Sequence, residues 1–350
     1  MSVATSSSPT KPEPADLVLQ GGGVKGIALA GAVEVLLRRY DIQRVAGTSA
    51  GAILASLIAA GYTGDEVREA MQSLPYAEVP DAKPPVPVFG PLAGLFRGNG
   101  LYRGDVIEHW IADRLAEKGV RVFADLPLLP DRTADPRLYE PDHAYRLVVT
   151  ATDITRGRGL VLPWDYRQAF GLDPAEQSVA RAVRMSLSIP LFFMPCRLTD
   201  ERTGQTSRIV DGGVMTNFPV QLFDRQDGGR PRWPTFGVGV IPDLPEADST
   251  LVRHMPFRLP GPFGVLEATV ATAISGHDQT YLGQPRNAAR LIRADTSQVG
   301  IVDFRIGEEQ RQWLVANGVA AAKEFLRSWN WKAYLDRFFP LHTAPFSIAT

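Results

Sequence analysis

The chain is 350 residues long, with 45% hydrophobic and 21% charged residues, so it can bury a large core as one large α/β domain or two smaller ones. Its formal net charge of −1 gives no electrostatic reason to expect nucleic acid or a strongly anionic membrane as a partner. The single cysteine, Cys196, excludes an internal disulfide, and the five histidines are too scattered to indicate a metal site.

Residues 1–14 are rich in Ser, Thr and Pro and lack the apolar core of a signal peptide, which predicts a disordered tail. The least polar stretch, residues 45–60, is interrupted by Thr48, Ser49 and Ser56 and is too short to cross a bilayer. We therefore expect a soluble, cytoplasmic protein, at most peripherally associated with membranes, with one folded domain over residues 15–345.

The first folded unit is a strand, a glycine loop and a helix. Apolar residues 16–20 predict the strand, and the helical spacing of Leu29, Val33 and Leu36 predicts a helix over 27–39. A glycine loop that opens a helix exposes unpaired backbone N–H groups, which suit an anion. The loop consists of Gly21, Gly22, Gly23, Val24, Lys25 and Gly26.

Three anions compete for this loop. Gly21, Gly23 and Gly26 satisfy the dinucleotide pattern G-x-G-x-x-G, but the ribose-binding acid should end the next strand, and Asp41 precedes that strand. A P-loop is excluded because Ile27 stands where its lysine should follow Gly26. The third candidate is the oxyanion of an acyl-transfer intermediate, which requires a nucleophile at the same sheet edge. Two adjacent parallel strands would bring the next turn of the chain to that edge.

That next turn, residues 47–51, reads Gly-Thr-Ser-Ala-Gly between an apolar strand at 42–46 and a helix-compatible run at 50–60. This is the G-x-S-x-G pattern of a nucleophile elbow. Gly47 and Gly51 leave room for a cramped turn that places the Ser49 hydroxyl at the positive end of the helix. In a chain with 32 glycines the same pattern can also arise by chance, and small residues at the start of a helix are a common packing device. The pattern alone therefore does not establish a catalytic serine, and motifs elsewhere in the chain are needed.

Residues 76–100 form a long Pro-rich loop with apolar side chains, which precludes regular structure. Such a loop is either a lid that contacts lipid or lines an acyl channel, or a surface excursion with a few buried anchors. A second Pro-rich apolar stretch spans residues 253–266. The expected lipid-facing segments are 86–96 and 255–263.

The remaining elements continue an α/β pattern without an internal repeat or a second domain. The apolar run 191–195 either lines a fatty-acyl pocket or belongs to the core, and we favour the core for its individual side chains. Strands are expected at 145–152, 160–162, 208–210, 235–241 and 289–294, and helices at 64–73, 102–118, 179–185, 266–282 and 308–330.

The strand at 208–210 leads directly into Asp211, Gly212 and Gly213. An acid at a strand end followed by two glycines can present a catalytic base. For an isolated Asp-Gly-Gly, however, an acid that caps a turn is the better interpretation.

In their order along the chain, the glycine loop, the elbow and Asp211-Gly212-Gly213 resemble the patatin-like family of lipid acyl hydrolases. That family has a G-G-G-x-[RK]-G loop, a G-x-S-x-G elbow shortly after it, and a D-G-[GA] turn much later. The resemblance covers about residues 15–300. Secondary similarities are Thr152-Asp153, Ser188-Ile189-Pro190 with Phe193 and Pro195, and Asn217-Phe218-Pro219.

The resemblance implies a three-layer α/β/α fold with a largely parallel central sheet, and a Ser–Asp dyad that needs no metal or cofactor. Ser49 is then the nucleophile, Asp211 the base, and backbone N–H groups of the glycine loop the oxyanion hole. A serine hydroxyl needs a base within reach, and partial burial would make the Asp211 carboxylate more basic. Lys25, where many relatives have Arg, is expected to support the loop and not to act in the chemistry.

The predicted function is hydrolysis of lipid carboxylic esters, of phospholipase A, lysophospholipase or esterase type, through an acyl-Ser49 intermediate. The expected partners are a lipid or other ester and transient contact with membranes, without nucleic acid. One alternative is an α/β-hydrolase triad, in which His254, His277 or His342 joins Ser49 and Asp211. A catalytically silent lipid-binding protein and, more weakly, a nucleotide-binding oxidoreductase are the others.

Overall fold

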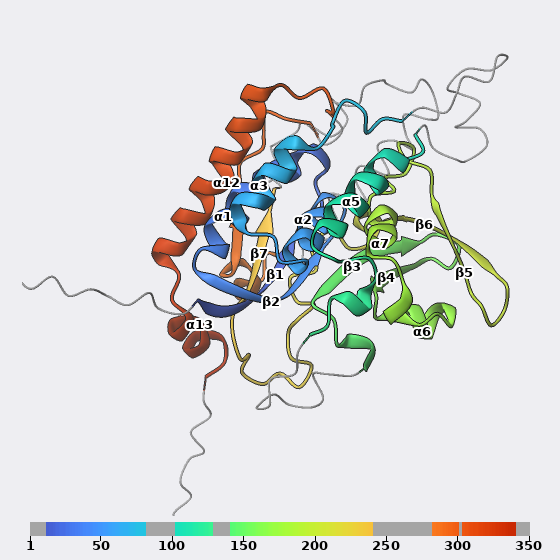
Figure 1. The fold of residues 1–350 in the computed structure, drawn as a ribbon. Helices are drawn as coiled ribbons and strands as arrows, with labels where there is room; N and C mark the ends of the chain where they lie inside the picture. The colour runs from blue at the N-terminus through green and yellow to red at the C-terminus, as the bar shows by residue number, and fades with distance from the viewer. Residues whose placement is uncertain (1–11, 82–101, 129–140, 241–281, 301–302, 341–350) are drawn as a thin grey trace, which may run out of the picture.

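The computed structural model describes residues 12–81, 102–128, 141–240, 282–300 and 303–340. They form an α/β fold in which a mixed, mostly parallel sheet is flanked by helices, as predicted (Figure 1). The following predictions concern residues outside these ranges: the loop over most of 76–100, the lipid-facing segments 86–96 and 255–263, a helix over most of 266–282, and roles for His254, His277 and His342.

Eight strands form one sheet in the described part of the chain: successive strands in the series β5-β6-β3-β2-β1-β7-β8 are hydrogen-bonded to each other, and β4 also pairs with β3. The strands are β1 (Glu13–Leu19), β2 (Tyr40–Gly47), β3 (Leu147–Asp153), β4 (Arg158–Leu162), β5 (Cys196–Thr199), β6 (Thr206–Asp211), β7 (Thr235–Gly239) and β8 (Leu291–Arg293). The helices are α1 (Gly26–Leu37), α2 (Ala50–Ala59), α3 (Gly64–Ser73), α5 (Asp105–Glu117), α6 (Asp165–Phe170), α7 (Val179–Ser186), α11 (Pro285–Ala288), α12 (Glu308–Ser328) and α13 (Trp331–Phe338).

The start of β1 corrects the predicted boundary between tail and domain. Residues 1–14 were expected to be a disordered tail, yet Glu13 and Pro14 already pair with Tyr40 and Asp41 of β2. Backbone pairing with a neighbouring strand extends β1 beyond its apolar residues, so hydrophobic pattern alone placed the start too late.

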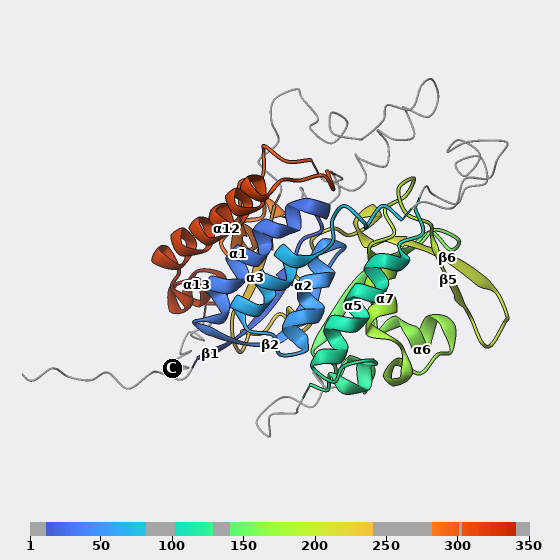
Figure 2. The ribbon, with the colours of Figure 1, turned by 45° about the horizontal axis from the view of Figure 1, so that its top comes forward.

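The parallel strands are buried on both faces, with a different set of neighbours on each. Leu17 and Leu19 of β1 belong to the larger core, whereas Val18, which points the other way, packs in a smaller core with Phe218 and Val220. The larger core lies under α12, α1, α3, α2, α5 and α7, which form a row of helices over one face of the sheet (Figure 2). None of the helices in the described ranges has the length and apolar character needed to cross a bilayer.

The strands β2 and β6 share one edge of β3. Along residues 149–153 of β3 the opposite edge is occupied by β4, so β2, opposite 147–149, and β6, opposite 151–153, must lie on the same edge. Because β2 is parallel and β6 antiparallel to β3, their carboxyl ends point toward each other. Gly47 pairs with Val149 and Asp211 with Ala151, a separation of two residues or roughly 7 Å along β3.

Sequence pattern located the long elements and missed some short ones. The bounds of α3 are those predicted, and a capping box explains its start: the Thr63 backbone N–H donates to Glu66 Oε2 at 2.7 Å, and the Glu66 N–H donates to Thr63 Oγ1. The elements β5, α6 and α13 were not predicted. Each has four to eight residues, too few for a hydrophobic period to stand out.

Candidate active site

Ser49 stands at the junction of β2 and α2, in a backbone conformation that side chains rarely adopt. Its φ and ψ are 51° and −125°, and it forms the N-cap of α2. Such a conformation costs on the order of 1–3 kcal/mol and persists only where its surroundings enforce it. The predicted strand-to-helix elbow is therefore the geometry observed, with Ser49 at the positive end of the helix.

Gly47 and Gly51 are required by the close approach of this turn to itself and to β1. A Cβ on Gly47 would lie 2.3 Å from the Gly51 carbonyl oxygen, and a Cβ on Gly51 would lie 2.4 Å from the Leu19 carbonyl oxygen. Real Cβ contacts are not this short, and backbone atoms on both sides leave no room to adjust. The two glycines of the motif thus fix how tightly the elbow packs against β1.

Asp211 ends β6 beside the elbow, with its carboxyl group buried. The Oδ1 atom accepts a hydrogen bond from the Gly213 N–H at 2.7 Å, whereas the buried Oδ2 atom has no hydrogen-bond partner among the described residues. Burial raises the pKa of Asp211 to about 7, and the nearby Ser49 hydroxyl and the Gly213 N–H oppose that rise. The Ser49 side chain is close enough to influence the carboxyl without satisfying hydrogen-bond geometry.

The turn that carries the candidate base, residues 211–213 (the base turn), and the elbow are also linked through β3. Thr48 Oγ1 and Thr150 Oγ1 are 2.6 Å apart and buried, so the residue before the nucleophile contacts β3 directly. Gly212 packs against the same threonine, since a Cβ there would lie 2.4 Å from Thr150 Oγ1. Thr150 therefore contacts both turns, one on each side of the two-residue gap along β3.

The glycine loop contributes three of its six backbone N–H groups to other contacts. The Gly21 N–H donates to the Asn217 carbonyl at 3.2 Å, the Lys25 N–H to the Gly22 carbonyl at 3.1 Å, and the Gly26 N–H to carbonyls within the loop. Gly23 and Val24 open the 3₁₀ turn that precedes α1, so their N–H groups have no acceptor inside that turn. The N–H groups of Gly22, Gly23 and Val24 remain as candidate oxyanion donors, and of these residues Gly23 and Val24 line the pocket described below.

Lys25 is buried at the start of α1. Desolvation lowers the pKa of its ammonium, and attraction to Asp295 partly opposes this effect. Its side chain thus lies among protein groups, and its role in supporting the loop remains a prediction.

An apolar pocket opens beside these groups. Ser49, Ala50, Gly23 and Val24 line one part of it, and the other described lining residues are apolar except for the hydroxyl of Tyr76. Phe193 belongs to this wall and is buried, so the run 191–195 supplies both core and pocket. The remaining lining residues are Ile53, Met71, Leu74, Tyr76, Val79, Ile107, Leu187, Ile189 and Phe304.

Sequence reasoning missed two contributors to this site. Ala50 is the first residue of α2, so its N–H also lacks an intrahelical acceptor, and it lines the pocket beside Ser49. The elbow pattern carried that signal, because the residue after the nucleophile commonly donates to the oxyanion. Ser186 accepts a hydrogen bond from the Ser49 N–H through its Oγ atom at 2.8 Å. No local sequence pattern predicts this hydrogen bond, because Ser49 and Ser186 are 137 residues apart.

Known proteins resemble this chain in sequence and in fold. A family model described as patatin-like phospholipase matches residues 17–224. YqhO of Bacillus subtilis, an uncharacterized protein, is 39% identical over 322 residues, which cover 90% of this chain and 99% of YqhO. R571 of Acanthamoeba polyphaga mimivirus, also uncharacterized, is 23% identical over 320 residues, which cover 88% of this chain and 92% of R571. The crystal structure of VipD from Legionella pneumophila superimposes with a TM-score of 0.51 at 18% identity, covering 91% of this chain and 67% of VipD.

Proposed function

We propose that this chain, which belongs to the patatin-like phospholipase family, hydrolyses lipid carboxylic esters with Ser49 as nucleophile and Asp211 as base. The observation that carries the proposal is the Asp211 carboxyl, buried next to Ser49 with one oxygen unpartnered among the described residues. A buried polar atom without a partner is costly, and such atoms are found where chemistry uses them. With a pKa of about 7, this carboxylate accepts a proton near neutral pH far better than an ordinary aspartate does.

In the proposed acylation step, Asp211 takes the proton of Ser49 as the serine oxygen attacks the ester carbonyl carbon. The electrons of the C=O double bond move onto the carbonyl oxygen, and this oxyanion accepts hydrogen bonds from the N–H groups of Gly23, Val24 and Ala50. When the tetrahedral intermediate collapses, the bond to the leaving alcohol breaks and that alcohol takes the proton from Asp211. An acyl-Ser49 ester remains.

Water completes the cycle at the same groups. Asp211 takes a proton from a water molecule as the water oxygen attacks the carbonyl carbon of acyl-Ser49. The same N–H groups bind the second oxyanion. The proton then passes to the Ser49 oxygen as the acyl bond breaks. The carboxylic acid leaves, and serine and carboxylate return to their starting states.

The wall of the pocket supports an apolar acyl group as the part of the substrate held beside Ser49. Among the described residues of the wall, the only polar side chain besides Ser49 is Tyr76, and its hydroxyl donates to the Met71 carbonyl at 2.9 Å. An acyl chain seated there replaces water next to apolar surface, which is worth about 0.8 kcal/mol for each buried methylene.

A fluorophosphonate probe and a panel of phospholipid, lysophospholipid, triacylglycerol and p-nitrophenyl esters test the proposal. The probe should label Ser49, and Ser49→Ala should abolish both labelling and hydrolysis. Asp211→Asn should lower kcat by at least about 10³-fold because the serine loses its base. Asp16→Asn is the control, since it alters another buried carboxylate, in the middle of β1, which bonds to Arg44. Labelling elsewhere, or full activity in Asp211→Asn, would contradict the dyad.

The triad alternative is separated by histidine variants. In a dyad, His254→Ala, His277→Ala and His342→Ala each retain most of the activity, whereas in a triad one of them loses as much as Ser49→Ala does. A catalytically silent lipid-binding protein would instead bind lipid without labelling at Ser49.

A further inference from the structure

The last turn of α7 ends beside the nucleophile. Ser186, the final residue of this helix, is fully buried, and its Oγ accepts the Ser49 backbone N–H at 2.8 Å. Ser49 holds a strained backbone conformation, so an acceptor fixed in the core helps to define where its peptide group lies. This contact belongs to no motif of the elbow itself.

Ser188, two residues after Ser186 on the same turn, contacts the candidate base. The Ser188 carbonyl accepts the Asp211 backbone N–H at 3.0 Å. Residues 186–188 therefore hydrogen-bond to the backbones of both reactive residues, which come from strands on opposite sides of the gap along β3. The contact through Thr150 joins the two turns from the sheet, and the 186–188 turn joins them from the helix side.

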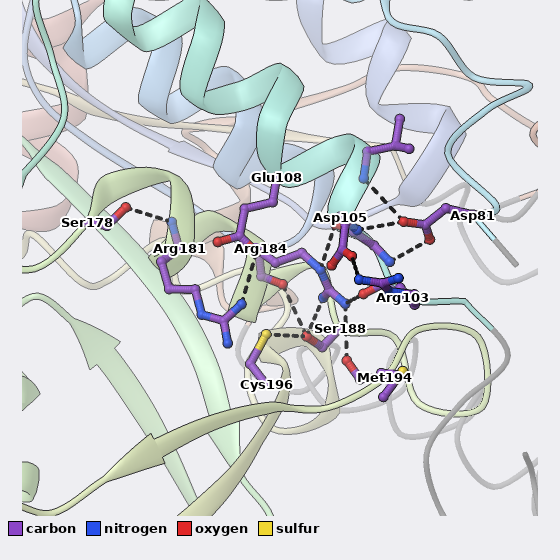
Figure 3. Close-up of polar contacts among 12 residues, drawn as sticks. Asp81, Arg103, Asp105, Glu108, Ser178, Arg181, Arg184, Ser188, Met194 and Cys196 are labelled. Carbon is purple, nitrogen blue, oxygen red and sulfur yellow. Dashed lines mark hydrogen bonds and ion pairs between the residues drawn. The ribbon is translucent and has the colours of Figure 1, made fainter. Parts of the chain in front are cut away.

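Arg184 anchors this turn, as Figure 3 shows. Its side chain is almost fully buried and donates to Ser188 Oγ at 2.7 Å, while Ser188 Oγ donates back to the Arg184 carbonyl at 3.1 Å. The other guanidinium N–H groups donate to the carbonyls of Gly104 at 3.0 Å, Arg103 at 2.5 Å and Met194 at 3.1 Å. A buried guanidinium that loses these neutral acceptors would leave charged donors unsatisfied, so the arrangement strongly resists displacement.

Arg184 also binds the backbone at the start of α5. Asp81 accepts hydrogen bonds from the N–H groups of Gly104 and Asp105 at 2.6 Å each, and Arg184 binds the Gly104 carbonyl on the same turn (Figure 3). The guanidinium also lies 5.1 Å from the ring centroid of Phe193, which lines the pocket. Arg184 thus connects α5, the pocket wall and the 186–188 turn.

We propose that the 186–188 turn is a positioning bracket for the dyad, in which Ser186 holds Ser49, Ser188 holds Asp211, and Arg184 fixes the turn in place. This inference rests on the proposed function. Proton transfer and attack require the two side chains to keep their mutual placement within about half an ångström, and an error of about 1 Å can cost 10²-fold in rate. Ser186, Ser188 and Arg184 are positioning residues, because they act through Ser49 and Asp211.

The first test is Ser186→Ala, with Ser56→Ala as the matched control. Ser56 is also fully buried, but its hydroxyl donates to the Ile53 carbonyl within α2 and contacts neither reactive residue. In Ser186→Ala we expect kcat and the rate of fluorophosphonate labelling to fall by at least about tenfold, with KM nearly unchanged. Thermal unfolding should shift by a similar amount in both variants. A Ser186→Ala enzyme with the kcat of Ser56→Ala would overturn the bracket.

The second test is a double-mutant cycle between Arg184→Lys and Ser188→Ala. Lysine keeps the charge but cannot donate to four acceptors, and Ser188→Ala removes the hydroxyl while it keeps the carbonyl that binds Asp211. If both act through one contact, kcat of the double variant should fall no further than kcat of Arg184→Lys. Independent, additive losses would contradict the anchoring role. If Arg184→Lys does not fold, the comparison of Ser186→Ala with Ser56→Ala decides alone.

Failure of the two proposals would look different. A wild-type protein that neither labels at Ser49 nor hydrolyses any ester of the panel contradicts the proposed function and the bracket with it. An active wild type whose Ser186→Ala variant equals its Ser56→Ala control contradicts the bracket only.

Discussion

The parallel part of the sheet and its antiparallel part position the two reactive residues in different ways. In the parallel part, β1 and β2 each end in a loop or turn that opens a helix, and Ser49 is held by the backbone of its own five-residue motif. In the antiparallel part, Asp211 reaches the site because β6 runs back along the free edge of β3. The turn that carries the nucleophile is therefore shaped by the sterics of its own motif, to which Ser186 adds one distant contact, whereas the base is placed by long-range register. We expect the two residues to be sensitive to different mutations.

The largest expected effects come from adding one methyl group to the turn of the nucleophile and one to the turn of the base, which tests whether the two turns differ. Gly47→Ala places a Cβ 2.3 Å from backbone in the elbow, so we expect it to destabilise the fold by about 3 kcal/mol or more and to abolish labelling. Gly212→Ala places a Cβ 2.4 Å from Thr150 Oγ1 and 2.6 Å from the Thr150 carbonyl oxygen, so it should shift the Asp211–Gly213 turn away from β3. There we expect a folded protein whose kcat falls about 10²-fold.

Thermal unfolding together with labelling kinetics measures both variants. Equal losses of stability in Gly47→Ala and Gly212→Ala would show that the two turns do not differ in this respect. Full activity of Gly212→Ala would show that the register of the base turn is not what limits the reaction.

We expect a smaller effect of pH on kcat/KM, and this effect reports on the base alone. The carboxylate form of Asp211 is the active one, and burial places its pKa at about 7. As pH falls below 7 the folded protein protonates Asp211, so kcat/KM should drop about tenfold for each pH unit and level off above 7. The pH profile of kcat/KM on a p-nitrophenyl ester measures this. A profile that remains flat down to pH 5 would contradict Asp211 as the base.

The same carboxyl also affects stability, with the opposite pH dependence. The folded-state pKa of Asp211 is raised above its ordinary value, so between about pH 4 and pH 7 the unfolded chain is ionised while the folded protein keeps the proton, and stability falls as pH rises. Asp211→Asn removes this cost of up to about 4 kcal/mol. We expect the variant to melt above wild type at pH 7.5, with the difference shrinking toward pH 4. A wild type that is more stable than the variant at pH 7.5 would contradict this.

Much of the fold followed from local sequence. The first strand–loop–helix unit, the elbow and the capped helix α3 were predictable because their signals, apolar periodicity and fixed turn residues, span few residues. The position of β1 beside β2 followed from the rule that sequential strands tend to be neighbours. The start of β1 at Glu13 and the short elements β5, α6 and α13 did not, since pairing and packing decide them.

The sequence alone determined the candidate nucleophile, the candidate base and the glycine loop, because each needs particular residue types in one short stretch. Only the tertiary structure decided how they meet. The antiparallel course of β6 places Asp211 opposite Ala151. Burial then makes its carboxyl basic, and the 186–188 turn joins it to Ser49. Register, burial and contacts across more than a hundred residues depend on the whole packed chain, so no short motif can specify them.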